Sequence, residues 1–127
     1  MKQLKINKHK LGEMGENAAV NYLIQNKYKI IKRNYRIGRI GEIDIIAQKD
    51  EYICFIEVKA RSNMMFGSPG ESVNARKQQT IRRLASIFMQ NSEYCKNYMR
   101  FDIVEIIIDI KNDGIVIKNI NIIENAF

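Results

Sequence analysis

The chain has 127 residues, 46% of them hydrophobic, and a net charge of +7, which suits one ordinary folded domain. No apolar run approaches the roughly 20 residues that cross a bilayer, and no apolar stretch follows the N-terminal lysines, so we expect neither a membrane protein nor a secretory signal. His9 is the only histidine, which excludes catalytic triads and histidine-rich metal sites. Cys54 and Cys95 lie far apart, so we expect reduced thiols and a cytoplasmic protein.

Charge is distributed unevenly along the chain. Residues 1–40 hold ten Lys and Arg against two acids, and residues 62–100 hold six against two. Residues 41–61 and 101–127 are net acidic. A basic surface attracts polyanions, of which nucleic acid is the commonest. A surface that only keeps the protein soluble is the alternative that charge alone leaves open.

The first expected elements are a helix over residues 11–26 and a short strand with a basic end over residues 28–36. At helical spacing Glu16 shares one side of the helix with Ala19 and Leu23. Glu16 therefore leans toward the apolar face, whereas an ordinary helical glutamate points to water.

The best-defined unit is a β-hairpin made of residues 41–48 and 52–61, with a short polar segment between the two runs. Side chains alternate between the faces of a strand. On the second strand, one face therefore holds Ile53, Phe55, Glu57 and Lys59. On the first strand it places Asp44 on the face opposite to Ile43, Ile45 and Ala47. Glu57 and Lys59 thus interrupt an apolar face, which costs stability unless they are paired or hydrated.

The remaining elements follow in the order of the chain. They are a loop over 61–72, an amphipathic helix over 74–90, and strands over 99–110 and 115–123 joined by an Asp-Gly turn. The order α-β-β-β-α-β-β predicts an α/β (α+β) fold with one mixed sheet and helices packed against it. We expect a single domain over residues 1–127.

Two carboxylates of the hairpin carry the expected chemistry. Strand pairing can bring Asp44 beside Glu57, where their charges repel. A hard divalent cation removes that cost, and Mg²⁺ takes oxygen ligands while keeping waters for a substrate phosphate. Lys59 follows Glu57 by two positions, about 7 Å along the strand, within reach of such a phosphate. An ordinary cross-strand salt bridge on a solvated face is the alternative.

Several strings in combination resemble one family. They are GEMGENAAVNYLIQNKYKIIKRNYR, GEIDIIA, FIEVKARS, FGSP and, after a basic helix, MRFDIV. Together they resemble the YraN-like proteins, a bacterial family of predicted nucleases. That family is similar in turn to the restriction-endonuclease-like superfamily with its PD-(D/E)-x-K site. It resembles above all the archaeal Holliday-junction resolvases, which also place a glutamate on the first helix.

This resemblance implies a site and a cofactor. Asp44 matches the aspartate of the motif, Glu57 and Lys59 match the E-x-K pair, and Glu16 matches the helix glutamate. These four would be catalytic. Mg²⁺, or Mn²⁺, would bind Asp44, Glu57 and the backbone carbonyl of Val58. Ile43 stands where the motif has proline, a residue that contributes no ligand. A Mg²⁺-dependent endonuclease is therefore the expected enzyme.

Nucleic acid is the expected partner, with DNA favoured over RNA and no membrane. The candidate nucleic-acid-binding residues are basic: Arg33, Arg36, Arg39, Arg76 and Lys77. The first three surround Tyr35, so they form a basic stretch with an aromatic side chain, which is typical of backbone binding. A solvated face is the alternative. A symmetric four-way junction would require a homodimer.

Two further residue sets have weaker expectations. Glu42 shares a face with Asp44, and we expect it to cap or bridge at the start of its strand. Arg100 and Asp102 begin a strand, where we expect a structural ion pair.

Other functions also fit the sequence. The first is a non-catalytic nucleic-acid-binding module that keeps the nuclease fold. The second is an assembly protein whose basic surface meets an acidic partner. The third is a nuclease that acts only inside a larger complex.

Overall fold

The computed structural model describes residues 8–62, 73–112 and 114–127. The elements in chain order are α1 (Lys8–Gln25), β1 (Lys29–Ile37), β2 (Gly41–Lys49), β3 (Tyr52–Ser62), α2 (Ala75–Gln90), β4 (Tyr98–Lys111) and β5 (Gly114–Ile123). The expected order and the mixed sheet are confirmed. Most of the expected loop over 61–72 lies outside the described residues, and its first two residues end β3. In the described part, no helix is both long enough and apolar enough to cross a membrane.

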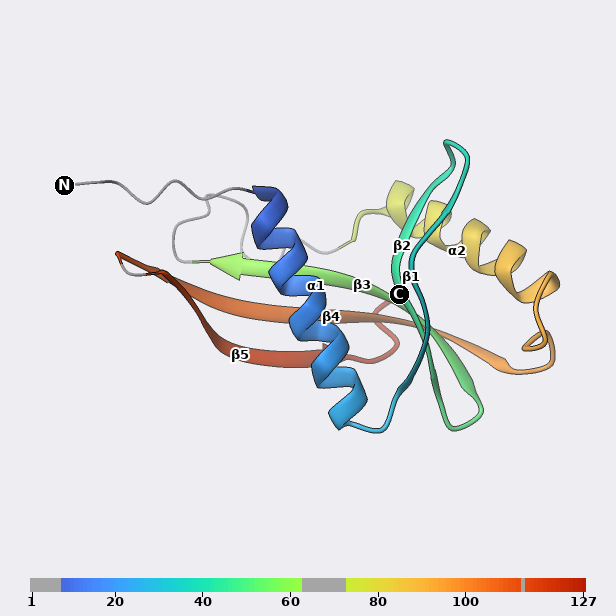
Figure 1. The fold of residues 1–127 in the computed structure, drawn as a ribbon. Coiled ribbons are helices and arrows are strands. Elements are labelled where there is room, and N and C mark those ends of the chain that lie inside the picture. Colours follow the sequence, from blue (N-terminus) through green and yellow to red (C-terminus); the bar gives the residue numbers. More distant parts are fainter. Residues whose placement is uncertain (1–7, 63–72, 113) are drawn as a thin grey trace.

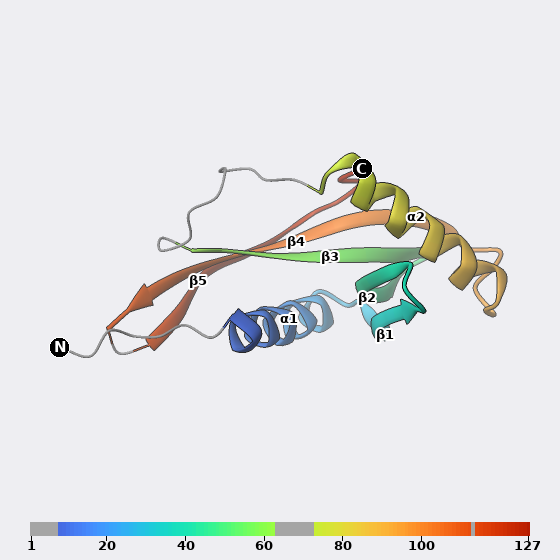
Figure 2. The ribbon, with the colours of Figure 1, turned by 90° about the horizontal axis from the view of Figure 1, so that it is seen from above.

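The five strands form one sheet in the order β1-β2-β3-β4-β5. Neighbouring strands are antiparallel, with the exception of β3 and β4, which run parallel from Tyr52↔Tyr98 to Ser62↔Ile108. Parallel neighbours need a crossover connection, and α2 lies in it. Figures 1 and 2 show α1 on one face of the sheet and α2 on the other. The central strand β3 is therefore buried from both sides.

Each face of the sheet has its own apolar cluster. The cluster under α1 includes Leu23, Ile45, Ala47, Cys54, Ile56, Val104 and Ile106. The cluster under α2 includes Ile43, Ile46, Ile53, Phe55, Ile81, Leu84 and Met89. The stripe expected on the helix over 74–90 is confirmed, since its apolar side chains are buried and Phe88 packs against them. Cys54 and Cys95 are free thiols, as expected.

A glycine lets α1 approach the sheet closely. A Cβ on Gly15 would lie 3.8 Å from the Cβ of Ala60 on β3 and 3.7 Å from Cδ1 of Ile106 on β4. These are ordinary van der Waals distances, so alanine would fit here, whereas a side chain larger than alanine would push the helix outward. The next residue is Glu16, so the same close contact carries that carboxylate to the edge of the sheet.

The predicted alternation along β2 is wrong at one point. Ile45 and Ala47 share the face under α1, but Ile43, which was expected on the same face, packs under α2. In β1 the residue facing this break is Asn34, between the pairs Arg33↔Ile45 and Tyr35↔Ile43. Asn34 has φ +53°, a left-handed conformation that asparagine tolerates better than most residues. The outer part of the hairpin is thereby rotated toward α2.

Candidate functional site

The site lies where β2 separates from β3. Their ladder ends at the pair Ile45↔Ile56, one residue before Asp44. Released from the ladder, Asp44 turns its side chain to β3, where Oδ2 accepts a hydrogen bond of 2.9 Å from the backbone N–H of Val58. The fork opens into a cavity of about 1050 Å³ between α1, the β1–β2 hairpin and β3. Asp44 thus lies just beyond the end of the β2–β3 ladder and not within it.

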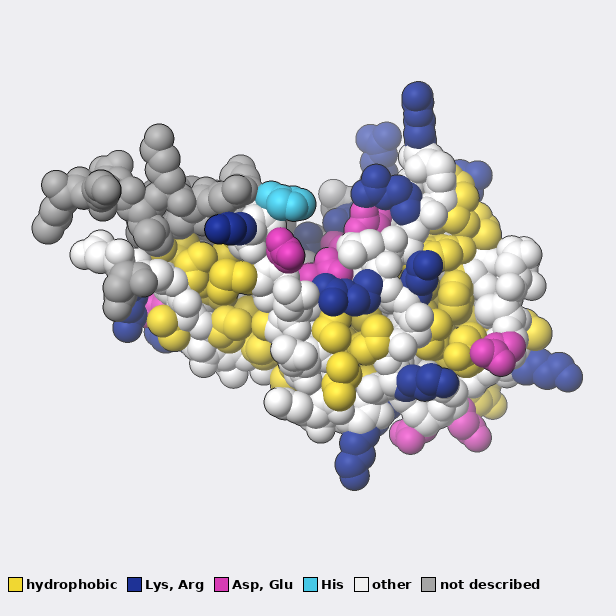
Figure 3. Space-filling view, in the orientation of Figure 1, with side chains coloured by type: hydrophobic (Ala, Val, Ile, Leu, Met, Phe, Trp, Pro, Cys, Tyr) yellow, Lys and Arg dark blue, Asp and Glu magenta, His cyan; other side chains and the backbone are white. Residues whose placement is uncertain are grey.

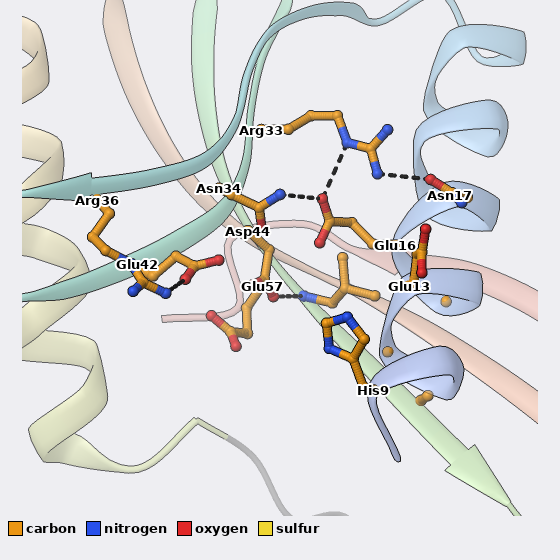
Figure 4. A pocket seen from close by; sticks show the side chains of 14 residues that line it. His9, Glu13, Glu16, Asn17, Arg33, Asn34, Arg36, Glu42, Asp44 and Glu57 are labelled. Atoms are coloured by element: carbon orange, nitrogen blue, oxygen red, sulfur yellow. Dashed lines mark hydrogen bonds and ion pairs between the residues drawn. The ribbon is translucent and has the colours of Figure 1, made fainter. Parts of the chain in front are cut away.

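Acidic side chains dominate this cavity. Its carboxylates come from α1 and from the two strands of the fork: Glu13, Glu16, Glu42, Asp44 and Glu57. Its basic lining residues are His9, Arg33 and Arg36. Figure 3 shows acidic side chains in the middle of this face, between the histidine and the basic side chains of the hairpin. In Figure 4 Glu16 approaches from α1, while Asp44 and Glu57 approach from the sheet.

The carboxyl of Asp44 is costly to ionise where it lies. Burial raises the pKa of its carboxyl from 3.8 to about 7, and the negative charge of Glu57 adds to the rise. The hydrogen bond from Val58 and the charge of Lys77 oppose it. A carboxyl with such a pKa exchanges its proton near neutrality, so a cation can displace that proton at little cost.

Glu57 is the most buried acid of the cleft, with 5% of its surface exposed. Its Oε1 lies 2.7 Å from Nζ of Lys77 on α2. Its Oε2 is buried and has no hydrogen-bond partner within the described residues. A buried carboxylate oxygen without a partner costs free energy. The arrangement therefore leaves one acceptor on Glu57 for a ligand.

Glu16 is held by the basic strand that faces it. Its Oε1 accepts from Nε of Arg33 at 3.1 Å and from Nδ2 of Asn34 at 3.0 Å, while the second Arg33 nitrogen donates to Asn17 at 2.7 Å. The Glu16 side chain is 15% exposed. The left-handed backbone of Asn34 therefore has two effects. It rotates the hairpin, and it directs the side-chain amide toward Glu16.

The predicted catalytic set is only partly assembled. Glu16, Asp44 and Glu57 line the cavity, and so does Val58. Lys59 is half-buried and is not among the described residues that line either large cavity. The lysine that meets Glu57 is Lys77.

The predicted nucleic-acid-binding residues do not form one strip. Arg33 is paired with Glu16, and Arg36 with Glu42; the latter pair is the bridge expected for Glu42. Arg39 is exposed in the turn between β1 and β2. The other two, Arg76 and Lys77, line a second cavity of about 470 Å³ on the α2 side. Asp44 and Glu42 line both cavities. The arginines of β1 and the basic residues of α2 therefore lie on two sides of the same acids.

The chemistry of the donors fits a hard cation in part. Within the described residues, no group of three Asp, Glu, His or Cys side chains is placed to hold a metal ion. Asp44 and Glu57 nevertheless form a carboxylate pair with an unpartnered buried oxygen. Mg²⁺ commonly takes only one or two carboxylates and fills its other positions with water and phosphate oxygens. The pair is therefore a sufficient protein contribution for Mg²⁺, although not for an ion that needs a full protein cage.

Several cleft residues escaped the sequence analysis. His9 and Glu13 precede Glu16 by seven and three positions, so all three share one helical face. That spacing was a readable signal. Gly41 was missed as well: its φ is +150°, and a Cβ there would lie 2.5 Å from Cγ2 of Thr80 on α2. Asn34 gave only the weak signal of an asparagine in a basic strand.

Fold and site together define an α+β domain with an acidic cleft at a fork between two antiparallel strands. A comparison with family models and with curated proteins then places the chain. The model of the family described as "Uncharacterised protein family UPF0102" matches residues 15–106. The chain belongs to this family, and the resemblance to YraN-like proteins is confirmed.

Relatives match nearly the whole chain. A UPF0102 protein of Acetivibrio thermocellus is 49% identical over 97% of this chain and 95% of its own length. One of Caldicellulosiruptor bescii is 46% identical over 96% of this chain and 100% of its own. One of Clostridium kluyveri is 44% identical over 92% of this chain and 93% of its own. The similarity therefore spans the fork, α2 and most of the sheet.

Proposed function

We propose that this protein is a Mg²⁺-dependent endonuclease that hydrolyses phosphodiester bonds of DNA, with branched or junction structures as candidate substrates. The observation that supports this most is the pair of carboxylates at the fork. Glu57 is buried and has an oxygen without a partner among the described residues, and burial together with the charge of Glu57 raises the pKa of Asp44. Such a pair is costly without a cation. The resemblance to the PD-(D/E)-x-K superfamily assigns the same two residues to metal binding.

Each residue of the proposed site has a role. Asp44, Glu57 and the backbone carbonyl of Val58 would hold Mg²⁺ or Mn²⁺. A bound cation would supply Lewis acidity, which activates water and polarises a phosphate. Lys59 would orient the attacking water or offset charge that develops on the phosphate. Glu16, held by Arg33 and Asn34, would position a water molecule on the opposite side of the cleft.

The charge of the molecule supports a nucleic-acid substrate. The net charge is +7, while the cleft itself is acidic, so basic groups around the rim would bind the backbone. Arg39 and Arg76 are exposed for that purpose, and Arg33 and Arg36 would exchange their carboxylate partners for phosphates. A four-way junction would require a homodimer. Free thiols at Cys54 and Cys95 support a reducing compartment, and we infer the cytoplasm.

A cleavage assay tests this function. Linear, flapped and four-way-junction DNA, together with RNA, would be incubated with the full chain in Mg²⁺ or Mn²⁺. We expect cleavage that leaves 5′-phosphates on at least one DNA form. The Glu57→Ala and Asp44→Ala variants should cut at least about 100-fold more slowly, yet bind as tightly or more tightly because acidic charge is removed.

Three other outcomes would overturn parts of the proposal. Variants that cut as fast as the parent would show that the site is assigned to the wrong residues. Salt-dependent binding without cleavage in any metal would favour a non-catalytic binding module that keeps the nuclease fold. No affinity for DNA even at low salt would favour an assembly protein with an acidic partner.

A further inference from the structure

Lys77 bridges the helix α2 to the buried acid of the cleft. Asn74 caps α2, and its side chain accepts a hydrogen bond of 2.8 Å from the backbone N–H of Lys77. The cap fixes the backbone of Lys77 in the first helical turn. From there the side chain reaches Glu57 on β3, with Nζ 2.7 Å from Oε1. The ammonium therefore lies at the same carboxylate that the proposed function assigns to the metal.

The two partners of this ion pair differ in their surroundings. The side chain of Glu57 is 5% exposed, whereas that of Lys77 is 43% exposed. The carboxylate is fixed in the sheet, but the lysine stem is flexible and reaches the pair from solvent. Lys77 does not contact the second oxygen of Glu57, which has no hydrogen-bond partner in the described part of the chain. The pair is thus half-satisfied, and its cation is the partner that can leave.

A withdrawn ammonium would remain in the cleft. Lys77 lines the second cavity, which shares Asp44 and Glu42 with the main cavity. Arg76 lines the same second cavity. A lysine that turned away from Glu57 would therefore lie beside the carboxylate pair, next to another cation. This is a suitable position for a phosphate of a strand that crosses the fork.

We propose that Lys77 is an exchangeable cation: its ammonium occupies Glu57 in the metal-free protein, and a divalent metal displaces it toward the phosphate of a bound strand. The proposal rests on the proposed function, because it uses the same carboxylate pair. No covalent bond forms or breaks in the exchange. One cation leaves Glu57 and another arrives. Lys77 would thus be a second lysine, besides Lys59, that contacts the substrate. It would contact the substrate only after the metal has bound.

Metal affinity measured without any cleavage tests the first half of the exchange. Mn²⁺ would be titrated into the full chain by calorimetry near pH 8, where carboxylates are normally ionised. Lys77→Ala should bind Mn²⁺ roughly fivefold or more tightly than the parent, because a competing positive charge is removed from the site. Arg83→Ala is the matched control, since Arg83 is exposed on α2 and does not line the cavities. It should change the affinity by less than about twofold, because an exposed charge is screened by salt. Glu57→Gln should abolish tight binding.

Strand affinity tests the second half. A fluorescein-labelled four-way junction would be bound in Ca²⁺, to suppress cutting, at fixed ionic strength. Lys77→Ala should weaken binding several-fold more than Arg83→Ala, and Lys77→Arg should restore most of it. Circular dichroism would show whether each variant folds. If Lys77→Ala fails this check, Lys77→Met keeps the stem and removes the charge.

The outcomes separate this inference from the proposed function. A parent that cuts DNA, with a Lys77→Ala variant that binds Mn²⁺ no more tightly, would overturn the exchange and leave the nuclease. A parent that never cuts, with tighter Mn²⁺ binding in Lys77→Ala, would support the exchange and overturn the nuclease. Absence of Mn²⁺ binding in both proteins would overturn both.

Discussion

The surroundings of Asp102 and Glu57, two buried carboxylates of this sheet, differ sharply. Asp102 is fully buried, and Nε of Arg100 donates to its two oxygens at 3.0 and 2.9 Å. The backbone N–H of Asn125 adds a bond of 3.0 Å, and Arg100 itself donates to the hydroxyl of Tyr28 at 2.7 Å. Among the residues that the structure describes, Glu57 has one ion pair, with a half-exposed lysine, and one oxygen without a partner.

The difference separates structure from function. The hydrogen bonds around Asp102 link β4, the C-terminal segment and Tyr28, as expected for a structural Arg100–Asp102 pair. At the fork, by contrast, Asp44 and Glu57 both lie near the ammonium of Lys77. Proteins keep incomplete polar groups mainly where a ligand completes them. The comparison therefore predicts that Asp102 matters for stability and Glu57 for ligand binding.

The largest expected effect is on the stability of an Asp102→Ala variant. Removing this carboxylate leaves the buried Arg100 with only a long ion pair of 3.9 Å to the exposed Glu124, which should lower the free energy of unfolding by about 3–5 kcal/mol. Glu57→Gln is the control, and it should change stability by less than about 1 kcal/mol because its pair is incomplete already. Urea unfolding followed by circular dichroism measures both. Equal losses of unfolding free energy in the two variants would contradict the distinction between a structural Asp102 and a ligand-binding Glu57.

A second effect concerns pH. The folded carboxyl of Asp44 has a pKa of about 7, against 3.8 for an ordinary aspartate, so between these values the folded protein binds more protons than the unfolded chain. The free energy of unfolding should therefore fall as pH rises from about 4 to about 7. For Asp44 this amounts to about 2 kcal/mol once solvent screening is allowed for.

Thermal unfolding in EDTA across this pH range would measure the effect. Asp44→Asn should flatten the slope, since its amide cannot ionise but its oxygen can still accept from Val58. A slope that is identical in the parent and in this variant would show that Asp44 ionises at an ordinary pH.

The third effect lies at the start of β2. Gly41→Ala should cost about 1–3 kcal/mol, because a Cβ there would meet Thr80 at 2.5 Å and φ is +150°. Gly12→Ala is the control: nothing lies within 4 Å of its Cβ, so alanine should stabilise α1 by up to about 1 kcal/mol. Adding Thr80→Ser to Gly41→Ala should recover only the steric part. No loss in Gly41→Ala would mean that the hairpin does not rest on α2.

The smallest expected effect on stability is at the rim of the cleft. Arg39→Ala should change the free energy of unfolding by less than about 0.5 kcal/mol, because the side chain is exposed. It should nevertheless weaken DNA binding and lower the slope of log affinity against log salt by about one. Lys96→Ala, exposed in the turn after α2, should leave that slope unchanged. Equal slopes in the two variants would remove Arg39 from the binding surface.

The fold was readable from the sequence because local signals agreed. Hydrophobic periodicity predicted each helix and strand to within a few residues, including the buried stripe of α2. Strand pairing also predicted that Asp44 and Glu57 would approach each other, and helical spacing turned Glu16 toward the sheet. These are short-range properties, which periodicity encodes well.

The details of the site depended on tertiary structure. Strict alternation failed at Ile43, because the left-handed Asn34 on the neighbouring strand rotates the hairpin. The pairing of Glu57 with Lys77 joins residues 20 positions apart on different elements, and no local pattern announces it. The predicted basic strip was divided for the same reason, since Arg33 found a carboxylate on α1.

Anomalous diffraction from crystals grown with Mn²⁺ tests the central claim most directly. The account predicts a peak within coordinating distance of the Asp44 and Glu57 carboxylates, with Nζ of Lys77 turned away from Glu57. Crystals in which Mn²⁺ binds elsewhere or not at all, while Lys77 still holds Glu57, would contradict it.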